Sequence, residues 1–281
     1  MTLVFRSTLF LVFSLFLAPI LATAQLLPEK LTGYLQKLPA QAQVNVAFES
    51  LTDDTRFFHR PDELVPSASV IKIPIMIETM EQVKAGKFDL EKVHVLLASE
   101  KTGGSGVLQT YPDESKLTNL EVLTLMMIRS DNSATNILIR ELGMDNINRR
   151  MQTLGLTQSR LNRVMMDTLA AKQGRENRVT AREMNLLLKK IYRNEVATPA
   201  LCAQMIDILK RNADQTTFRL FLPKSAVIAH KTGELTYVRG DAGIFYVTRP
   251  FLLSVFVQGT TTPEAEKIIG EIAAICYNQY L

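Results

Sequence analysis

Three short motifs supply the residue types that acyl transfer at a carbonyl group requires. Ser69-Val70-Ile71-Lys72 comes first, Ser130-Asp131-Asn132 follows in the middle of the chain, and Lys231-Thr232-Gly233 lies near the C-terminus. A serine hydroxyl is a poor nucleophile until a neighbouring base takes its proton. The motifs therefore offer a nucleophile, a candidate base and several polar groups for a substrate.

Ser69 and Lys72 are three positions apart, so on a helix their side chains lie on one face and can meet. The lysine can act as the base if burial or a second cation lowers its pKa, and Lys231 is the candidate second cation. A serine near a helix N-terminus also has free backbone N–H groups for a developing oxyanion. A lone S-x-x-K is weak support, because roughly one is expected by chance in a chain this long.

The other two motifs make coincidence improbable, at roughly a few in a thousand for all three together. Ser130 lies in a predicted break between helices, where its hydroxyl can pass a proton to a leaving nitrogen. Asn132 offers an amide to a substrate carbonyl. We expect Lys231 and Thr232 to bind a substrate carboxylate from an edge-like strand, and Gly233 to let a substrate backbone approach.

Strand-like segments lie at both ends of the chain and helix-like segments lie between them. Helical periodicity runs from Ser67 to Asn212, except in a loop over Thr157–Val179 that we expect to be functional. The terminal elements are helices over 27–38 and 262–280 and strands over 43–50, 55–59, 227–232, 240–247 and 251–259.

This order predicts an α/β + all-α fold, in which one antiparallel sheet with flanking helices is built from both termini and a helical domain is inserted. The expected boundaries are a signal peptide at residues 1–24, an α/β domain at 25–61 plus 213–281, and an all-helical domain at 62–212.

Residues 1–24 are typical of a secretory signal peptide. Arg6 is their only charge, the apolar core runs from Leu9 to Leu21, and Ala22-Thr23-Ala24 supplies the small residues of a cleavage site. The alternative is a membrane anchor, but the run is shorter than the roughly 20 residues that span a bilayer. We therefore predict a secreted or periplasmic protein, without stable membrane insertion after cleavage.

Composition excludes several classes of protein. The 281 residues are 47% hydrophobic and 21% charged, which is typical of a globular protein. The net charge of +4 is spread along the chain without a basic block, so we expect no nucleic-acid partner. We also expect no cofactor and no metal, since no nucleotide-binding glycine motif occurs and the histidines and cysteines lack ligand spacing. Cys202 and Cys276 can be paired or free.

The three motifs resemble those of the active-site-serine family of class A β-lactamases and penicillin-binding proteins. The segregated layout is also similar to the class A fold. The resemblance implies that Ser69 is the acylated nucleophile, Lys72 its proton partner and Ser130 the proton shuttle. It further implies a carboxylate pocket and amide contact from Asn132, Lys231, Thr232 and Gly233, and an oxyanion hole from the backbone N–H groups of Ser69 and Glu234.

One segment departs from the family pattern. Class A enzymes have an Ω-loop of the form R-x-E-x-x-L-N, whose glutamate and asparagine hold the deacylating water. Here Arg163 and Leu169 match, but Met165 stands at the glutamate position and Ala170 at the asparagine position. Without that base, deacylation is expected to lose about a hundred- to ten-thousandfold in rate. Asp167 is either a replacement base or a loop brace or cap, and we favour the brace or cap.

The sequence thus predicts an exported serine hydrolase acting on a small β-lactam or a peptidoglycan stem peptide. It leaves open a slow β-lactamase and a D,D-peptidase acting on D-Ala-D-Ala peptides. A third alternative is a non-catalytic envelope protein that binds peptides in the same pocket. We expect a monomer.

Overall fold

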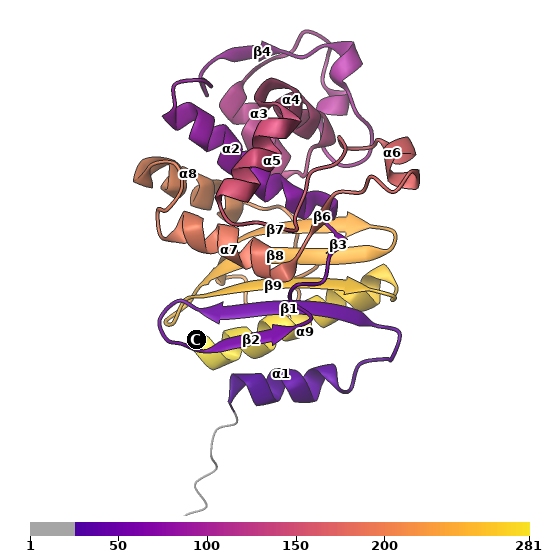
Figure 1. Ribbon diagram of the computed structural model, residues 1–281, viewed down its shortest axis with the longest axis vertical. Coiled ribbons are helices and arrows are strands. Elements are labelled where there is room, and N and C mark those ends of the chain that lie inside the picture. Colours follow the sequence, from indigo (N-terminus) through magenta and orange to yellow (C-terminus); the bar gives the residue numbers. More distant parts are fainter. Residues whose placement is uncertain (1–25) are drawn as a thin grey trace, which may run out of the picture.

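The computed structural model describes residues 26–281, and the predicted signal peptide lies outside the described residues. Its central feature is a five-stranded antiparallel sheet in the order β2-β1-β9-β8-β7 (Figure 1). The N-terminal hairpin and the C-terminal meander thus form one sheet, which confirms the predicted fold class. The strands are β1 (Gln43–Ser50), β2 (Arg56–His59), β7 (Val227–Leu235), β8 (Val238–Tyr246) and β9 (Phe251–Gln258).

The sheet separates two hydrophobic cores, because successive side chains of a strand point to opposite faces. In β1, Val46 and Phe48 pack in the core beneath α1 (Leu27–Leu35) and α9 (Thr262–Tyr280). Ala47, between them, belongs to the core on the helical side. There α7 (Ala181–Tyr192) lies on the sheet, and Asn185 donates to the Ala47 carbonyl at 2.9 Å.

The helical layer is organised around α2 (Lys72–Lys84), which contacts five other helices of the layer. Every side chain from Lys72 to Met80 is buried. A helix that is apolar almost all round is buried in this way. The surrounding helices are α3 (Asn119–Ile128), α4 (Asn132–Leu142), α5 (Met144–Thr153), α7 and α8 (Pro199–Lys210).

The prediction of almost continuous helix from Ser67 to Asn212 is wrong between α2 and α3. That segment contains two short paired strands, β4 (Val93–Val95) and β5 (Lys116–Thr118), and the 3-10 turns η2 (Ala98–Glu100) and η3 (Leu108–Thr110). Glycines and Pro112 interrupt the helical period there. The predicted loop over Thr157–Val179 is largely irregular, but it contains the short elements α6 (Thr168–Lys172) and β6 (Arg178–Val179), and β6 pairs with β3 (Val65–Pro66).

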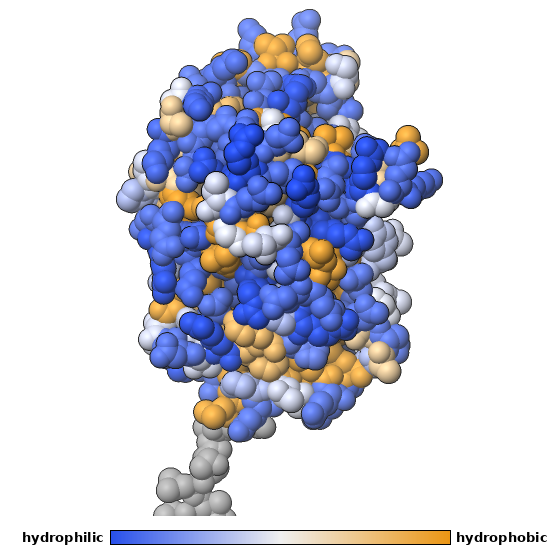
Figure 2. Space-filling view, viewed as in Figure 1, coloured by the Kyte–Doolittle hydropathy of each residue, from blue (hydrophilic) through white to orange (hydrophobic). Residues whose placement is uncertain are grey.

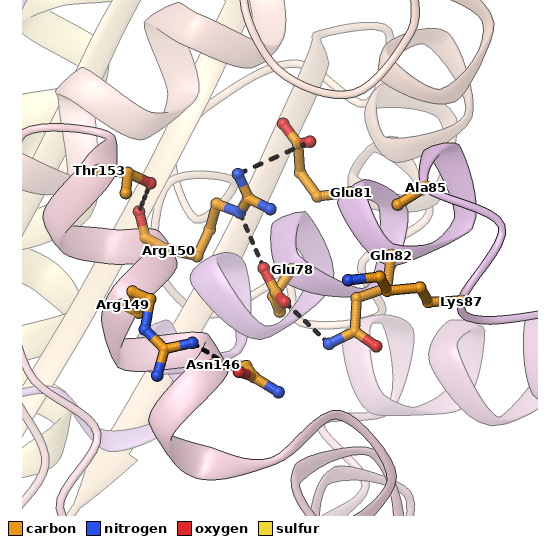
Figure 3. A pocket seen from close by; sticks show the side chains of 9 residues that line it. All are labelled: Glu78, Glu81, Gln82, Ala85, Lys87, Asn146, Arg149, Arg150 and Thr153. Carbon is orange, nitrogen blue, oxygen red and sulfur yellow. Dashed lines mark hydrogen bonds and ion pairs between the residues drawn. The ribbon is translucent and has the colours of Figure 1, made fainter.

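A charged cleft of about 260 Å³ lies between the C-terminal half of α2 and α5 (Figure 3). Arg150 Nε donates to the buried Glu78 carboxylate at 2.8 Å, and its Nη1 lies 3.8 Å from Glu81. Gln82 donates to the other oxygen of Glu78 at 2.8 Å. These contacts tie α2 to α5 and fix the helix that begins at Lys72.

Cys202 and Cys276 are both free thiols. Cys202 lies in the core on the helical side and Cys276 in the core beneath α9. Of the two alternatives left open by the sequence, the free state holds. The surface drawn in Figure 2 is mainly hydrophilic, with hydrophobic side chains in small separate patches. Among the helices of residues 26–281, none combines the length and the apolar character needed to cross a bilayer.

Candidate active site

A cavity of about 510 Å³ opens where the sheet meets the helical layer. It lies beside the C-terminal end of β7, the edge strand nearest the helical layer (Figure 1). Gly104, Ser105, Asn132 (the first residue of α4) and the segment from Arg163 to Asn177 complete its walls. Residues that line it include Ser69, Ser105, Asn132, Met165, Glu176 and Glu234.

Ser69 lies on η1 (Ala68–Ile71), the 3-10 turn that leads directly into α2. The helix begins at Lys72 and not at Ser69, so Pro74 falls in the first helical turn, where Pro is tolerated. Ala68 has φ +45°, an unfavourable value for a residue with a side chain. Such strain directly before a candidate nucleophile is typical of functional sites.

Lys72 is fully buried at the base of this region. Its Nζ donates to the Ser130 carbonyl at 2.7 Å, to Ser130 Oγ at 3.1 Å and to Asn132 Oδ1 at 3.3 Å. Burial lowers the pKa of Lys72 well below its usual value, and the charge of Lys231 lowers it further. Among residues 26–281 the Ser69 hydroxyl makes no hydrogen bond, so the expected Ser69–Lys72 contact is not formed in this state.

Ser130 lies between two lysines. Lys231 Nζ donates to its hydroxyl at 3.2 Å, opposite the bond from Lys72, and also to the Thr232 carbonyl at 2.7 Å. Burial is the main reason that the pKa of Lys231 falls to about 8, against the attraction of Asp241 and Asp214. The second cation inferred from the sequence thus lies where it lowers the pKa of Lys72.

The Ser130 turn is held by a residue that the sequence reasoning passed over. Asp131 caps α4 by accepting from Ala134 N at 2.9 Å. Its other oxygen accepts from Val107 N at 2.6 Å and Leu108 N at 2.8 Å. Asp131 therefore fixes the loop before η3 against the helix that carries Asn132. Its place inside the Ser130-Asp131-Asn132 motif was the available signal.

Strand β7 approaches Ser69 at Gly233. A Cβ at Gly233 would lie 3.0 Å from Ala68 Cβ, Ser67 O and Val70 Cγ2. The glycine is thus required by the contact of β7 with η1, whereas its role towards a substrate stays a prediction. This contact brings Glu234 and Ser69 to the same cavity, and Thr232 is buried on the same edge strand.

Arg239 is a second residue that the sequence analysis missed. Its guanidinium is almost fully buried on β8, where it donates to Asp214 at 2.7 Å and to Glu266 at 3.1 Å. It also donates to the Gly233 carbonyl at 3.3 Å. Arg239 on β8 thereby holds the backbone of β7 at Gly233, next to the cavity. The strand predicted from the sequence began at Gly240, so Arg239 fell outside it and gave no signal of a buried position.

Arg163 clasps the ends of the Ω-loop together. Its Nε and Nη2 donate to the two oxygens of Glu176 at 2.9 and 3.1 Å, and both side chains are largely buried. Tyr237 adds a hydrogen bond to the same carboxylate at 3.0 Å. The Glu176 carboxylate, although it lines the cavity, is therefore committed to closing the loop.

Met165 lies in the cavity wall where the family pattern has glutamate. Asn136 holds its backbone from both sides, accepting from Met165 N at 2.7 Å and donating to Met165 O at 3.1 Å. Asp167 accepts from Ala170 N at 2.9 Å as the N-cap of α6, which agrees with the capping interpretation. Among the described residues that line the cavity, Glu176 and Glu234 are the only carboxylates, and the Glu234 side chain is 58% exposed near Arg239.

The fold and the site together define an active-site-serine enzyme of the class A β-lactamase type. The defining features are the buried Lys231 on an edge strand, Ser69 shortly before the buried Lys72, and the helical layer inserted between the strands. The family model described as the beta-lactamase enzyme family matches residues 27–280. The chain belongs to that family.

Individual relatives are distant but cover nearly the whole chain. Beta-lactamase VEB-1 of Pseudomonas aeruginosa is 27% identical over 302 residues, which cover 98% of each protein. A PBP-A point mutant in its acyl-enzyme complex with penicillin G superposes with a TM-score of 0.83 at 26% identity, covering 90% of this chain and 96% of that one. A β-lactamase of Sphaerobacter thermophilus gives the same TM-score and identity, covering 90% and 97%.

Proposed function

We propose that this protein opens β-lactam rings through an acyl-enzyme at Ser69 and hydrolyses that acyl-enzyme slowly. The observation that carries the proposal is the Ser130 hydroxyl held between Lys72 and Lys231 in the region that also contains Ser69. A nucleophile, a base of lowered pKa and a proton relay are the parts that serine acyl transfer needs.

In the proposed reaction, neutral Lys72 accepts the Ser69 proton while Ser69 Oγ attacks the lactam carbonyl carbon. The backbone N–H groups of Ser69 and Glu234 stabilise the oxyanion. The C–N bond then breaks, and the leaving nitrogen takes the Ser130 hydroxyl proton, which Lys72 replaces. Lys72 ends the step neutral, as it began.

Substrate orientation is assigned to the groups around this relay. Lys231 and Thr232 bind the carboxylate beside the lactam nitrogen, and the Asn132 amide binds the acylamino carbonyl. With a pKa of about 8, the Lys231 side chain is still protonated in most molecules at neutral pH. The site therefore favours an anionic substrate.

Met165 favours a second candidate function, that of a penicillin-binding D,D-peptidase. Its thioether cannot activate water, and Glu176 is occupied by Arg163. Such a site acylates through Lys72 but deacylates slowly, so β-lactams would act on it partly as inhibitors while D-Ala-D-Ala peptides turn over.

We further propose that the chain is exported by residues 1–24 and works as a periplasmic or secreted monomer. Both substrate classes occur outside the inner membrane. N-terminal sequencing of the exported protein and its elution volume test these two statements.

A chromogenic cephalosporin tests the function directly. We expect a burst of one equivalent followed by a slow steady state, with the adduct located on Ser69 by mass spectrometry. S69A should abolish both phases. Rapid turnover without an accumulated adduct would contradict slow deacylation, and the absence of any adduct on the folded protein would favour the peptide-binding alternative.

A further inference from the structure

A histidine and an aspartate that the proposed reaction does not use face each other inside the sheet. His230 lies on β7 and Asp241 on β8, and neither side chain is accessible to solvent. His230 Nδ1 lies 2.9 and 3.0 Å from the two oxygens of Asp241. His230 directly precedes Lys231, and Asp241 is the strand partner of Thr232. The pair is therefore adjacent to both residues of the proposed carboxylate pocket.

The pair and Lys231 occupy opposite faces of the sheet. Successive side chains of a strand point to opposite sides. Lys231 reaches Ser130 on the helical side. The His230 ring packs against Phe218, with 6.1 Å between ring centroids, in the core beneath α9. Asp241, which is bonded to His230, thus lies across the strand backbone from the active site.

The hydrogen bonds around Asp241 favour an ionised carboxylate and a neutral imidazole. Its Oδ2 also accepts from Thr217 Oγ1 at 2.7 Å and from Phe218 N at 3.4 Å. His230 Nε2 has no hydrogen-bond partner within residues 26–281. A proton on Nε2 would be buried without an acceptor, which is costly, so the ring carries its one proton on Nδ1. The pair therefore carries the single negative charge of Asp241.

No lysine or arginine in the described part of the chain forms an ion pair with Asp241. The charge of Asp241 opposes the lowering of the Arg219 pKa by burial, but the Arg219 guanidinium donates to a backbone carbonyl instead. Asp214, in contrast, is bound by Arg239 at 2.7 Å. The charge of Asp241 is thus free to act on other groups in the protein interior.

Lys231 is one of the groups that this charge reaches. Burial lowers the pKa of Lys231 to about 8, and Asp241 is the first of the charges that oppose this fall. Asp214 acts in the same direction and Arg239 in the opposite one. Lys72 is the neighbouring cation on the active-site side. Because the protein interior screens charge weakly, a buried carboxylate can act through the thickness of one strand.

We propose that Asp241 is a positioning residue for the carboxylate pocket, because its buried charge, oriented by His230, acts through the sheet and keeps Lys231 in the cationic form that binds a substrate carboxylate. The proposal rests on the proposed function for the role of Lys231. Removing the charge should lower the pH at which Lys231 loses its proton by about one unit. At pH 8 the protonated fraction would then fall roughly fivefold, and at pH 6 it would change little.

The test uses D241N, which keeps the shape of the side chain and removes its charge. Ser69 acylation is measured between pH 5 and pH 10 with a cephalosporin and with the methyl ester of its carboxylate. With the free carboxylate, the alkaline limb of the second-order rate constant should move down by about one pH unit in D241N. With the ester, D241N and wild type should have the same profile. An equal loss with both compounds at every pH would indicate a structural effect and overturn the proposal.

Two further variants separate charge from structure. D207N removes the same charge from α8, which packs on β7, but the Asp207 side chain is 69% exposed and its charge is screened by water. T217V removes a hydrogen bond to Asp241 and keeps the charge. Both should keep the alkaline limb of wild type. A shift in either variant as large as in D241N would overturn the proposal.

A second measurement does not depend on activity. NMR of protein labelled with ¹³C in its lysines follows the protonation of Lys231, whose signal is assigned by its loss in K231R. Lys231 should titrate about one pH unit lower in D241N than in wild type. An unshifted titration would overturn the proposal, even if D241N were less stable. A shifted titration in a protein that no β-lactam acylates would instead refute the proposed function and uphold the effect of Asp241 on Lys231.

Discussion

The Ser130 hydroxyl lies 3.2 Å from Lys231 Nζ, on a chain segment whose carbonyl is bound by a second lysine. Ser130 itself has φ +53°, so its backbone is held in a left-handed conformation to reach this position. Two buried lysines thus share one hydroxyl. Burial, and secondly the charge of Lys231, lowers the pKa of Lys72 and so keeps Lys72 available as a base while Lys231 carries the charge.

The pH dependence of acylation follows from these two lysines. Below the lowered pKa of Lys72 the base is protonated, and above about pH 8 Lys231 loses its charge, so kcat/KM should fall on both sides. K231R should move the alkaline limb upward, because arginine stays charged throughout this range. Stopped-flow acylation between pH 5 and pH 10 measures both limbs. An unmoved alkaline limb in K231R would mean that Lys231 is not its source.

Restoring a carboxylate at Met165 should accelerate deacylation. M165E places a base in the cavity wall, at a backbone position that Asn136 already fixes from both sides. The deacylation rate is expected to rise about a hundred- to ten-thousandfold, with acylation little changed. M165Q controls for size and polarity. Decay of the isolated acyl-enzyme, followed by mass spectrometry, separates the two variants, and equal rates would argue against general base catalysis.

Weakening the Arg163–Glu176 pair should increase the mobility of the Ω-loop more than it lowers the stability of the whole fold. E176Q weakens both charged hydrogen bonds from Arg163, which are worth about 1.5–3 kcal/mol each. We expect faster amide hydrogen exchange between residues 163 and 176, with a smaller loss in Tm. Y237F removes one hydrogen bond to the same carboxylate, worth about 0.5–1.5 kcal/mol, and should act in the same direction more weakly. If amide exchange became faster by the same factor across the whole chain, the Arg163–Glu176 pair would not have a role confined to the loop.

The Glu78–Arg150 pair should contribute more to stability than an exposed pair of similar geometry. Glu78 is buried and Arg150 is partly exposed, so E78A should cost about 1–3 kcal/mol through the unpaired guanidinium and the lost packing of α2. The exposed pair Arg182–Asp62 is the comparison, and D62A should cost about 1 kcal/mol or less. Urea unfolding of both variants gives the free energies, and equal losses would contradict the importance of burial.

The sequence predicted most terminal elements closely. The strand over 43–50 and the helix over 262–280 have the expected bounds, because their apolar periods are clear and their ends carry turn residues and a capping threonine. The segment between α2 and α3 was predicted poorly. Its short strands and turns depend on tertiary partners such as Asp131, which no local pattern records.

The same distinction applies to the site. The motifs identified Ser69, Lys72, Ser130, Asn132 and Lys231, and the structure gathers these residues in one region. The supporting residues were missed because each is defined only by its partner: Arg239 by Asp214 and Glu266, and Asn136 by the backbone of Met165.

Because both thiols of the chain are buried in different cores, the fold contains no disulfide bond and needs no oxidative step to form. The protein should fold equally well with or without a thiol oxidant, and its activity should be insensitive to reductants. Residues 26–281 can thus be produced in a reducing cytosol, where each variant described above would fold without disulfide exchange.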